Sequence, residues 1–254
     1  MLRAGRRIYK ANGYDDCEYT GFTKIKVLIT EDIKKNEYGT ISPYETKNKD
    51  GIIIENLWQF SKVYKEVPHV KETFSRFDKR IVWEHPAEKH VDDTGKLTPE
   101  YYAWRKKGME NKRAVRYPVG KGIGTRASCL YALATRPDGS IDENTKLDYI
   151  QARKAIYVPE FCKSLQNEPD FLQLKQRYQN GEKLLIIEVD GPHQESLDYY
   201  KKKYGVDDDF FVNGTVEVNV KNMKILLNDP KHPFGHGYCL AMELAGITEQ
   251  VLKA

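Results

Sequence analysis

The chain has 254 residues, of which 40% are hydrophobic and 31% are charged, and this composition predicts a globular protein rather than a disordered one. The 41 basic and 37 acidic residues leave a formal charge of +4, which is too small by itself to indicate a nucleic-acid-binding protein. Apolar runs of about 18 residues are absent from the sequence, so we expect no transmembrane helix.

The cysteines and the N-terminal segment indicate a reducing compartment. Cys17, Cys129, Cys162 and Cys239 are far apart and include no Cys-x-x-Cys pair, which favours free thiols. The first seven residues are basic but lack the apolar core of a secretory signal. We therefore expect a cytoplasmic protein.

The first part of the chain is predicted to contain one strand and one helix. Residues 1–20 are polar and rich in turn residues, and we interpret them as an irregular lead-in. Residues 21–30 alternate and then become continuously apolar, which predicts a strand. A turn signal at residues 48–51 then opens a helix predicted over residues 51–64.

The predicted helix 51–64 has two different faces at about 100° per residue. Its apolar face contains Ile53, Leu57, Phe60 and Tyr64, and its polar face contains Glu55, Gln59 and Lys62 with Trp58 at the edge. The simplest interpretation of the polar face is exposure to solvent. The alternative is that it forms the wall of a catalytic cleft.

The middle of the chain is the hardest part to interpret. Residues 68–78 are expected to be helical or irregular. Residues 83–126 contain few apolar side chains and look like an insertion or lid, within which Thr98 and Pro99 predict a helix start. Gly120–Gly124, next to Lys121 and Arg126, predicts either a mobile loop or backbone amides that hold a phosphate. Residues 127–135 are apolar and predict a helix.

The second half predicts alternating helices and strands. We expect helices over residues 147–162 and 169–178, a strand over 183–190, a strand or hairpin arm over 215–220, and a final helix over 234–252. In the final helix, Gly237, Ala241 and Ala245 are four apart and would allow close approach of another element. His232 and His236 are interpreted as turn and helix-start residues, and no metal site is predicted.

Glu188 and Asp190 lie where the predicted strand 183–190 meets a Gly-Pro turn. Carboxylates at such a strand end either line a cleft or simply face solvent. The sequence leaves both alternatives open.

Three segments resemble the NADAR superfamily, which includes the riboflavin-intermediate N-glycosidases. Tyr38-Gly39-x-x-Ser42-Pro43-Tyr44 is similar to the family's Tyr-Gly…Ser-Asn-Phe loop. Glu55-Asn56-x-x-Gln59-x-x-Lys62 resembles its Glu-His-x-x-Gln-x-x-Lys signature, with Asn56 in place of the His. Residues 237–244 are similar to its closing Leu-Gly-x-x-Leu-Met helix. The family's Asp-x-x-Trp-Gly segment has no clear counterpart, and Glu188, Asp190 or Asp229 would fill its acidic place.

The resemblance implies a NADAR-like α+β fold, mainly helical with a small sheet, as a single domain over residues 1–254. It also implies an ADP-ribose-like or ribosylamine-phosphate ligand and cleavage of a C–N glycosidic bond without a metal or cofactor. Glu55 would stabilise the oxocarbenium-like sugar or act as acid and base, and Lys62 would attack C1 as a neutral amine. Gln59 would hold a ribose hydroxyl, and Asp190 completes the catalytic set. The implied substrate-binding residues are Tyr38, Gly39, Ser42, Tyr44, Trp58, Lys121, Arg126, Glu188 and Gly237.

Two other interpretations of the sequence stay open. In the first, the chain binds a nucleotide or ADP-ribose without turnover. In the second, it is an accessory protein that binds nucleic acid through the basic stretch 105–126 together with Tyr101, Tyr102 and Trp104.

Overall fold

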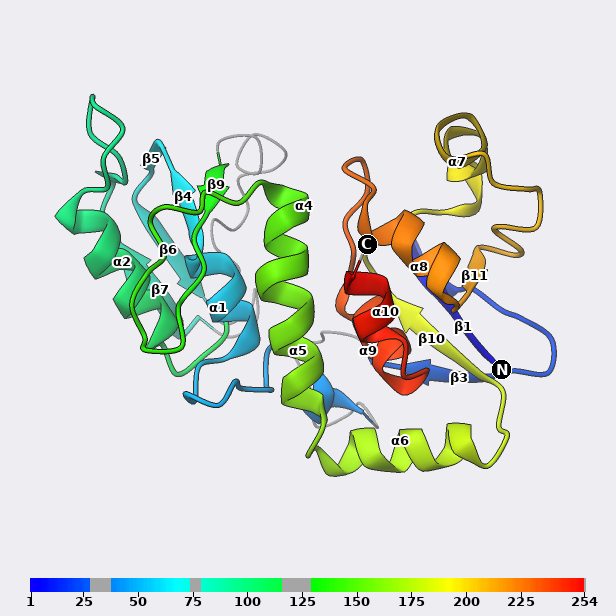
Figure 1. Cartoon of the computed structure of the whole chain (residues 1–254). Helices are drawn as coiled ribbons and strands as arrows, with labels where there is room; N and C mark the ends of the chain where they lie inside the picture. Colours follow the sequence, from blue (N-terminus) through cyan, green and yellow to red (C-terminus); the bar gives the residue numbers. More distant parts are fainter. Residues whose placement is uncertain (28–37, 74–78, 116–128, 254) are drawn as a thin grey trace. The chain divides into compact units, whose positions relative to one another are not determined.

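The computed structural model describes residues 1–27, 38–73, 79–115 and 129–253 (Figure 1). Its helices and strands confirm the predicted α+β class. The backbone divides into two compact units. Unit 1 contains Met1–Ser42 and Phe161–Ala254, and unit 2 contains Pro43–Glu160. Within the described residues, the structure has no helix that is long and apolar enough to cross a membrane.

A five-stranded sheet forms the centre of unit 1. Its strands are β1 (Leu2–Lys10), β2 (Gly13–Asp16), β3 (Thr23–Lys26), β10 (Leu184–Glu188) and β11 (Thr215–Glu217). The order is β11-β1-β10-β3, with β2 paired to β1. β10 runs parallel to both β1 and β3, and all five of its residues are buried. This burial explains why β10 reads as a continuous apolar run and was predicted correctly.

The interpretation of residues 1–20 as an irregular lead-in is wrong, because β1 occupies a central place in this sheet. Its polar sequence misled the prediction. Arg3 and Arg7 are buried, and each has a partner that compensates for its burial. Arg3 Nε donates to Thr215 Oγ1 at 2.7 Å, and Arg7 Nε donates to Asp16 Oδ1 at 2.6 Å.

The helices of unit 1 include two, α7 (Leu197–Tyr204) and α8 (Val220–Leu227), that the sequence did not predict. The others are α5 (Val158–Leu165, which crosses the unit boundary), α6 (Pro169–Gln179), α9 (His236–Leu244) and α10 (Thr248–Leu252). The predicted strand 215–220 ends at Glu217, and Asn219 caps α8. The predicted final helix is broken at Gly246, whose φ is 67°.

α9 lies across β10 (Figure 1). Its small residues predicted that another element would approach it closely. A Cβ placed on Gly237 would lie 3.3 Å from Ile186 Cγ2 and 2.8 Å from Glu188 Oε2. Glycine is therefore required for this close packing of the helix on the strand.

Unit 2 combines short antiparallel strand pairs with helices. The strands are β4 (Lys62–Tyr64), β5 (Glu66–Val67), β6 (Val70–Thr73), β7 (Ile81–His85), β8 (Glu88–Lys89) and β9 (Cys129–Ala132), paired as β4–β9, β5–β8 and β6–β7. The helices are α1 (Ile54–Phe60), α2 (Pro99–Met109) and α4 (Tyr149–Ala152). A π-helical turn, Arg153–Tyr157, joins α4 to α5, so the predicted helix 147–162 is confirmed with shifted ends.

The helix predicted over residues 51–64 is shorter than expected. The turn before it is confirmed, since Asn48 Oδ1 accepts from Asp50 N and Gly51 has a φ of 78°. The helix ends at Phe60, and Lys62 already pairs with Ala132 of β9. The predicted helix over 127–135 is also wrong in its described part, because residues 129–132 are this partner strand.

The described part of the predicted insertion 83–126 contributes large side chains to the hydrophobic core of unit 2. Thr98 caps α2 as predicted, since its Oγ1 accepts from Tyr101 N at 3.2 Å. Trp83, Tyr101 and Trp104 are at most 3% exposed, and the Phe60 and Trp104 ring centroids are 4.7 Å apart. The apolar residues of this segment are few, but they are large aromatic side chains. Residues 68–78 likewise include a strand, β6, rather than a helix.

Candidate functional site

Glu55, Gln59 and Lys62 form a hydrogen-bonded row in unit 2. Gln59 Nε2 donates to Glu55 Oε1 at 2.8 Å, and Lys62 Nζ donates to Gln59 Oε1 at 2.7 Å. An ammonium group only donates and a carboxylate only accepts, so these neighbours fix the orientation of the Gln59 amide. The spacing in the sequence therefore brings an acid, an amide and an amine into one connected group.

Two local features position this row. Glu55 lies in the first turn of α1, where its backbone N donates to Pro43 O at 2.9 Å and Ile54 N donates to Thr46 O at 3.0 Å. These bonds hold the turn that contains Tyr44, which is half-buried, at the start of the helix. Lys62 enters the row from β4 rather than from the helix.

The polar face of α1 is not a simple solvated face. Glu55 is only 7% exposed, and Gln59 and Lys62 are half-buried. A carboxylate at such a place interacts more strongly with a nearby charge than an exposed one does, because less water screens it. The Glu55 carboxylate is therefore less screened by water than a carboxylate on a solvated helix face.

Aromatic side chains surround one end of the row. Lys62 Nζ lies 4.5 Å from the centroid of the Trp58 ring, in cation–π geometry. The Trp58 ring is 5.3 Å from that of Tyr157 and 6.1 Å from that of Tyr149, measured between centroids. Trp58 is half-buried, so part of its surface remains accessible beside the amine.

Asn56, which replaces the histidine of the NADAR signature, is fully buried and has a structural role. Its Nδ2 donates to Asn111 O at 3.1 Å and to Arg113 O at 2.9 Å, and its Oδ1 accepts from Val115 N at 2.8 Å. This side chain ties α1 to the segment that follows α2. Among the described residues, both N–H groups of Nδ2 donate hydrogen bonds, and Oδ1 accepts one of the two that it could accept.

The predicted residues at the end of β10 lie in unit 1. Glu188 is fully buried, and its Oε1 accepts from Val189 N at 2.7 Å and Asp190 N at 3.0 Å. Its Oε2 accepts from Gly237 N, at the first turn of α9, and lies 3.4 Å from His236 Nδ1. Asp190 is exposed on the turn after the strand. Glu188 thus joins β10 to α9, and Asp190 contributes its backbone N–H to this network.

The first NADAR-like segment divides between the units. Tyr38 is buried in unit 1, and its hydroxyl accepts a hydrogen bond from Arg177. Gly39 begins a 3-10 turn that Ser42, also buried, closes by donating from its N to Gly39 O at 3.2 Å. Tyr44, by contrast, lies in unit 2 with the Glu55 row. Lys121 and Arg126 lie outside the described residues.

Asp229, the third acidic candidate, is fully buried in unit 1 within an aromatic cluster that the sequence did not reveal. Tyr199 OH and Tyr200 OH each donate to its carboxylate at 2.6 Å. Burial raises the pKa of Asp229, but the hydrogen bonds from these tyrosines and from His232 outweigh it and lower the pKa to about 2. The spacing Asp229-x-x-His232 was the one available signal for this cluster.

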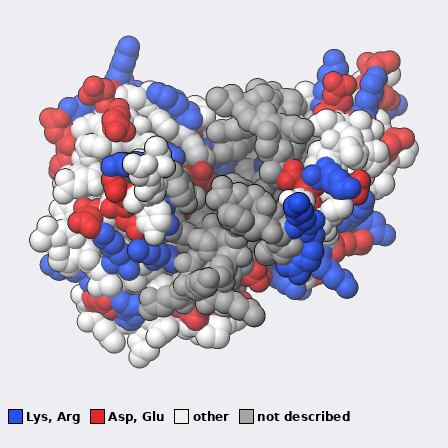
Figure 2. Space-filling view, turned by 180° about the vertical axis from the view of Figure 1, so that it is seen from behind, with Lys and Arg blue, Asp and Glu red and all other residues white. Residues whose placement is uncertain are grey.

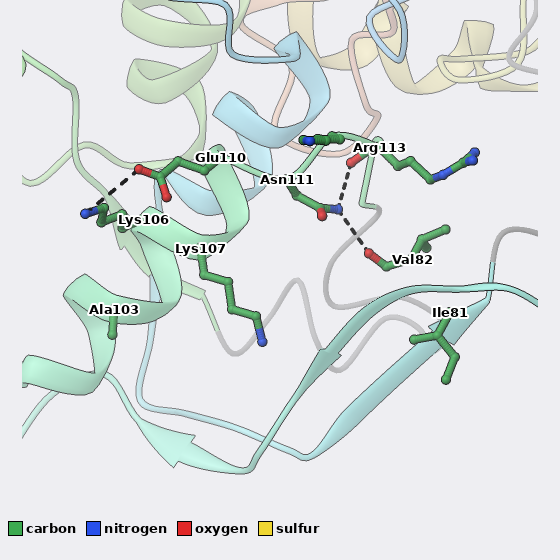
Figure 3. Close-up of a pocket in the computed structure, with 9 residues that line it drawn as sticks. Ile81, Val82, Ala103, Lys106, Lys107, Glu110, Asn111 and Arg113 are labelled. Carbon is green, nitrogen blue, oxygen red and sulfur yellow. Dashed lines mark hydrogen bonds and ion pairs between the residues drawn. The ribbon is translucent and has the colours of Figure 1, made fainter.

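A separate open hollow of about 660 Å³ lies in unit 2 between the end of α2 and β7 (Figure 3). Four exposed cationic side chains line it, namely Lys106, Lys107, Lys112 and Arg113.

The prediction of a basic and aromatic surface for nucleic acid is wrong in part. Tyr101, Trp104 and Arg105 are buried in the core rather than exposed. Figure 2 shows basic and acidic side chains interspersed on the described surface that it presents.

Comparisons of the chain with protein-family models, with curated proteins and with solved structures found no match. Within the described residues, no group of three or more His, Cys, Asp or Glu side chains is arranged to hold a metal ion. The site is therefore argued from its own geometry.

Proposed function

We propose that the chain is an N-glycosidase that cleaves the C–N bond between a ribose and a nucleobase, with the Glu55–Gln59–Lys62 row as its catalytic group. The observation that carries this proposal is the row itself, in which hydrogen bonds of 2.8 and 2.7 Å join a buried carboxylate to an amide and an amine. The similarity of these three positions to the NADAR signature supports the same reaction.

Glu55 has the central role in the proposed reaction. Breaking the C–N bond leaves positive charge on C1 and the ring oxygen of the sugar, and a nearby carboxylate lowers the energy of that state. Glu55 then accepts a proton from the water that attacks C1. The bond from Gln59 holds the carboxylate in one orientation while the sugar changes charge.

The contacts of Lys62 favour a different role from the one that the resemblance implies. The cation–π contact with Trp58 favours the ammonium form, whereas attack on C1 requires the neutral amine. The hydrogen bond to Gln59 can be donated by either form. We therefore assign Lys62 as a charged donor to the leaving base or to a ribose hydroxyl. Trp58 provides the aromatic surface on which the base stacks.

The proposal is tested with a panel of N-ribosyl compounds that includes nicotinamide adenine dinucleotide, an ADP-ribosylated base and a ribosylamine phosphate. Release of the free base is measured by chromatography. Glu55→Gln is expected to lower kcat/KM by about 10²-fold or more. Glu66→Gln, the same change at an exposed position of β5, is the matched control. Wild-type turnover in Glu55→Gln would exclude Glu55 as a catalytic residue.

Binding without turnover is the second candidate function, because the hydrogen bonds within the row already engage Glu55 and Lys62 with Gln59. Calorimetric titration with ADP-ribose separates the two candidates. Binding that Trp58→Ala abolishes, together with no base release from any compound in the panel, would favour a nucleotide-binding protein over an enzyme.

Nucleic-acid binding remains a candidate for the hollow, because its cationic side chains outnumber the single acidic one, Glu110. Salt dependence of binding to a labelled single-stranded oligonucleotide tests it. Each lysine that contacts a phosphate contributes about 0.7 to the slope of log K against log salt, so Lys112→Gln would reduce the slope by about that amount.

A further inference from the structure

Ser196, His232 and Asp229 form a continuous hydrogen-bonded relay in unit 1. His232 Nδ1 lies 2.6 Å from Asp229 Oδ2, and His232 Nε2 lies 3.3 Å from Ser196 Oγ. The two imidazole nitrogens thus face a buried carboxylate on one side and a hydroxyl on the other. This is the order of groups in which a histidine activates a serine as a nucleophile.

The bonding of this relay selects the tautomer that such activation needs. Asp229 accepts a hydrogen bond from Nδ1, so Nδ1 carries the proton and Nε2 is an acceptor. Ser196 Oγ accepts from His193 N at 3.4 Å, which leaves the serine O–H to donate towards His232 Nε2. The 3.3 Å separation is in the range of catalytic pairs without bound substrate.

The rest of the aromatic cluster keeps Asp229 ionised and the imidazole in place. Tyr200 OH donates to Asp229 Oδ2 at 2.6 Å and lies 3.1 Å from His232 Nδ1. The Tyr200 and His232 rings stack at 5.6 Å between centroids. Because Asp229 has a pKa of about 2, it is a carboxylate throughout the neutral range and stabilises an imidazolium beside it.

The reactive end of the relay is accessible and lies near a positive charge. Ser196 is half-buried, and the His232 side chain is 15% exposed. Burial lowers the pKa of His193, the charge of Arg6 lowers it further, and the charge of Glu195 opposes this effect. Arg6 Nη1 donates to Gly191 O at 2.7 Å, and its buried Nε has no hydrogen-bond partner among the described residues.

We propose that Ser196, His232 and Asp229 form a second catalytic centre, one that hydrolyses carboxylic esters through a covalent acyl-serine. Ser196 Oγ attacks the carbonyl carbon while its proton passes to His232 Nε2. The C–O bond to the alcohol then breaks, and the alcohol leaves with that proton. Water attacks the acyl group, gives a proton to His232 and releases the acid, and the proton returns to Ser196. Asp229 positions the imidazole throughout.

The test uses a fluorophosphonate probe on the full chain, followed by peptide mapping. Attack by Ser196 Oγ on phosphorus expels fluoride and leaves the probe bonded to the serine. We expect the label on Ser196 of the folded wild-type protein, and heat-denatured protein should not react. Wild-type protein that stays unlabelled, or that carries the label at another residue only, would overturn the proposal regardless of how any variant folds.

Variants and an ester substrate then test the roles. With 4-nitrophenyl acetate, Ser196→Ala and His232→Gln are expected to lower kcat/KM by about 10²-fold or more. Ser164→Ala is the matched control, because Ser164 Oγ donates only to Phe161 O of its own helix turn. Ester hydrolysis at the wild-type rate in Ser196→Ala would exclude the acyl-serine. Since Glu55 takes no part in this relay, Glu55→Gln should hydrolyse the ester normally.

Discussion

Gly108 of α2 lies against the ring of Phe60 of α1, so closely that a Cβ on Gly108 would be 2.1 Å from Phe60 Cδ1. The absence of a side chain at Gly108 lets α1 and α2 pack together. Gly108→Ala should therefore lower the free energy of unfolding by about 1–3 kcal/mol, despite the better helix propensity of alanine. Chemical denaturation measures this change. In a Phe60→Leu background the same substitution should cost less, and an equal cost in both backgrounds would contradict the contact.

Asn56→Ala should destabilise the chain by about 2–4 kcal/mol. The substitution removes three hydrogen bonds and leaves backbone groups at residues 111, 113 and 115 without these partners, of which the N–H of Val115 is buried. Asn144→Ala, at an exposed position, is the control and should change stability by about 0.5 kcal/mol or less. Thermal unfolding monitored by circular dichroism compares the two, and equal melting temperatures would show that the Asn56 network contributes little.

Glu88 should make the stability of unit 2 depend on pH. Burial, followed by the charge of Glu100, raises its pKa from 4.5 to about 7. In the folded state Glu88 thus keeps its proton to a higher pH than in the unfolded chain. Its contribution to stability is full below pH 4.5 and is lost as the pH rises to about 7.

Glu88→Gln removes this loss, so its stability relative to wild type should increase between pH 4.5 and 7 and stay constant above. Buried His90, whose pKa is lowered to about 3 and whose Nε2 lies 3.5 Å from Glu88 Oε1, has the opposite pH dependence. Denaturation at several pH values measures the difference. A difference that does not vary with pH would contradict the raised pKa of Glu88.

Glu188→Gln should lower the free energy of unfolding by about 2–4 kcal/mol. One of its two oxygens becomes an NH₂ group. This group then faces a backbone N–H from which the carboxylate had accepted a hydrogen bond. Glu182→Gln is the control, because Glu182 pairs with Arg177 at the surface and such pairs contribute about 0–1 kcal/mol. If both variants lose the same stability, Glu188 is not the tie between β10 and α9.

Lys62 should not form a covalent imine with the sugar. Borohydride reduction during turnover would trap such an imine as a mass increase on the peptide that contains Lys62. We expect no mass increase, together with an activity that Lys62→Arg retains in part and Lys62→Gln loses. A trapped sugar on Lys62 would instead assign it as the nucleophile, as the resemblance implies.

Local sequence patterns predicted those elements whose residues are determined by near neighbours. β10 was predictable because Leu184–Ile187 are buried on both faces, and α2 because Thr98 and Pro99 mark its start. β1 was missed because the partners of its buried arginines lie elsewhere in the chain, at Thr215 for Arg3. The end of α1 was missed because Lys62–Tyr64 keep a helical spacing but pair with β9.

The same limit applies to the sites. Glu55, Gln59 and Lys62 were predictable as a group because they lie within eight residues of one another. Tyr149 and Tyr157, which pack on Trp58, are 91 and 99 residues away from it, and no local pattern connects them. Ser196 and His232 are likewise separated in sequence, and only the fold brings the serine to the imidazole.

The central position of β1 also has a consequence for the order of folding. Leu2 pairs with Leu184 and Gly5 with Thr215, so during synthesis β1 emerges from the ribosome long before its main partners. Unit 2 is contiguous in sequence and is synthesised in that interval, while β1 has only β2 to pair with. An apolar strand that stays unpaired during synthesis would tend to pair with strands of other chains. We expect the arginines of β1 to keep the nascent chain from aggregating until β10 and β11 arrive.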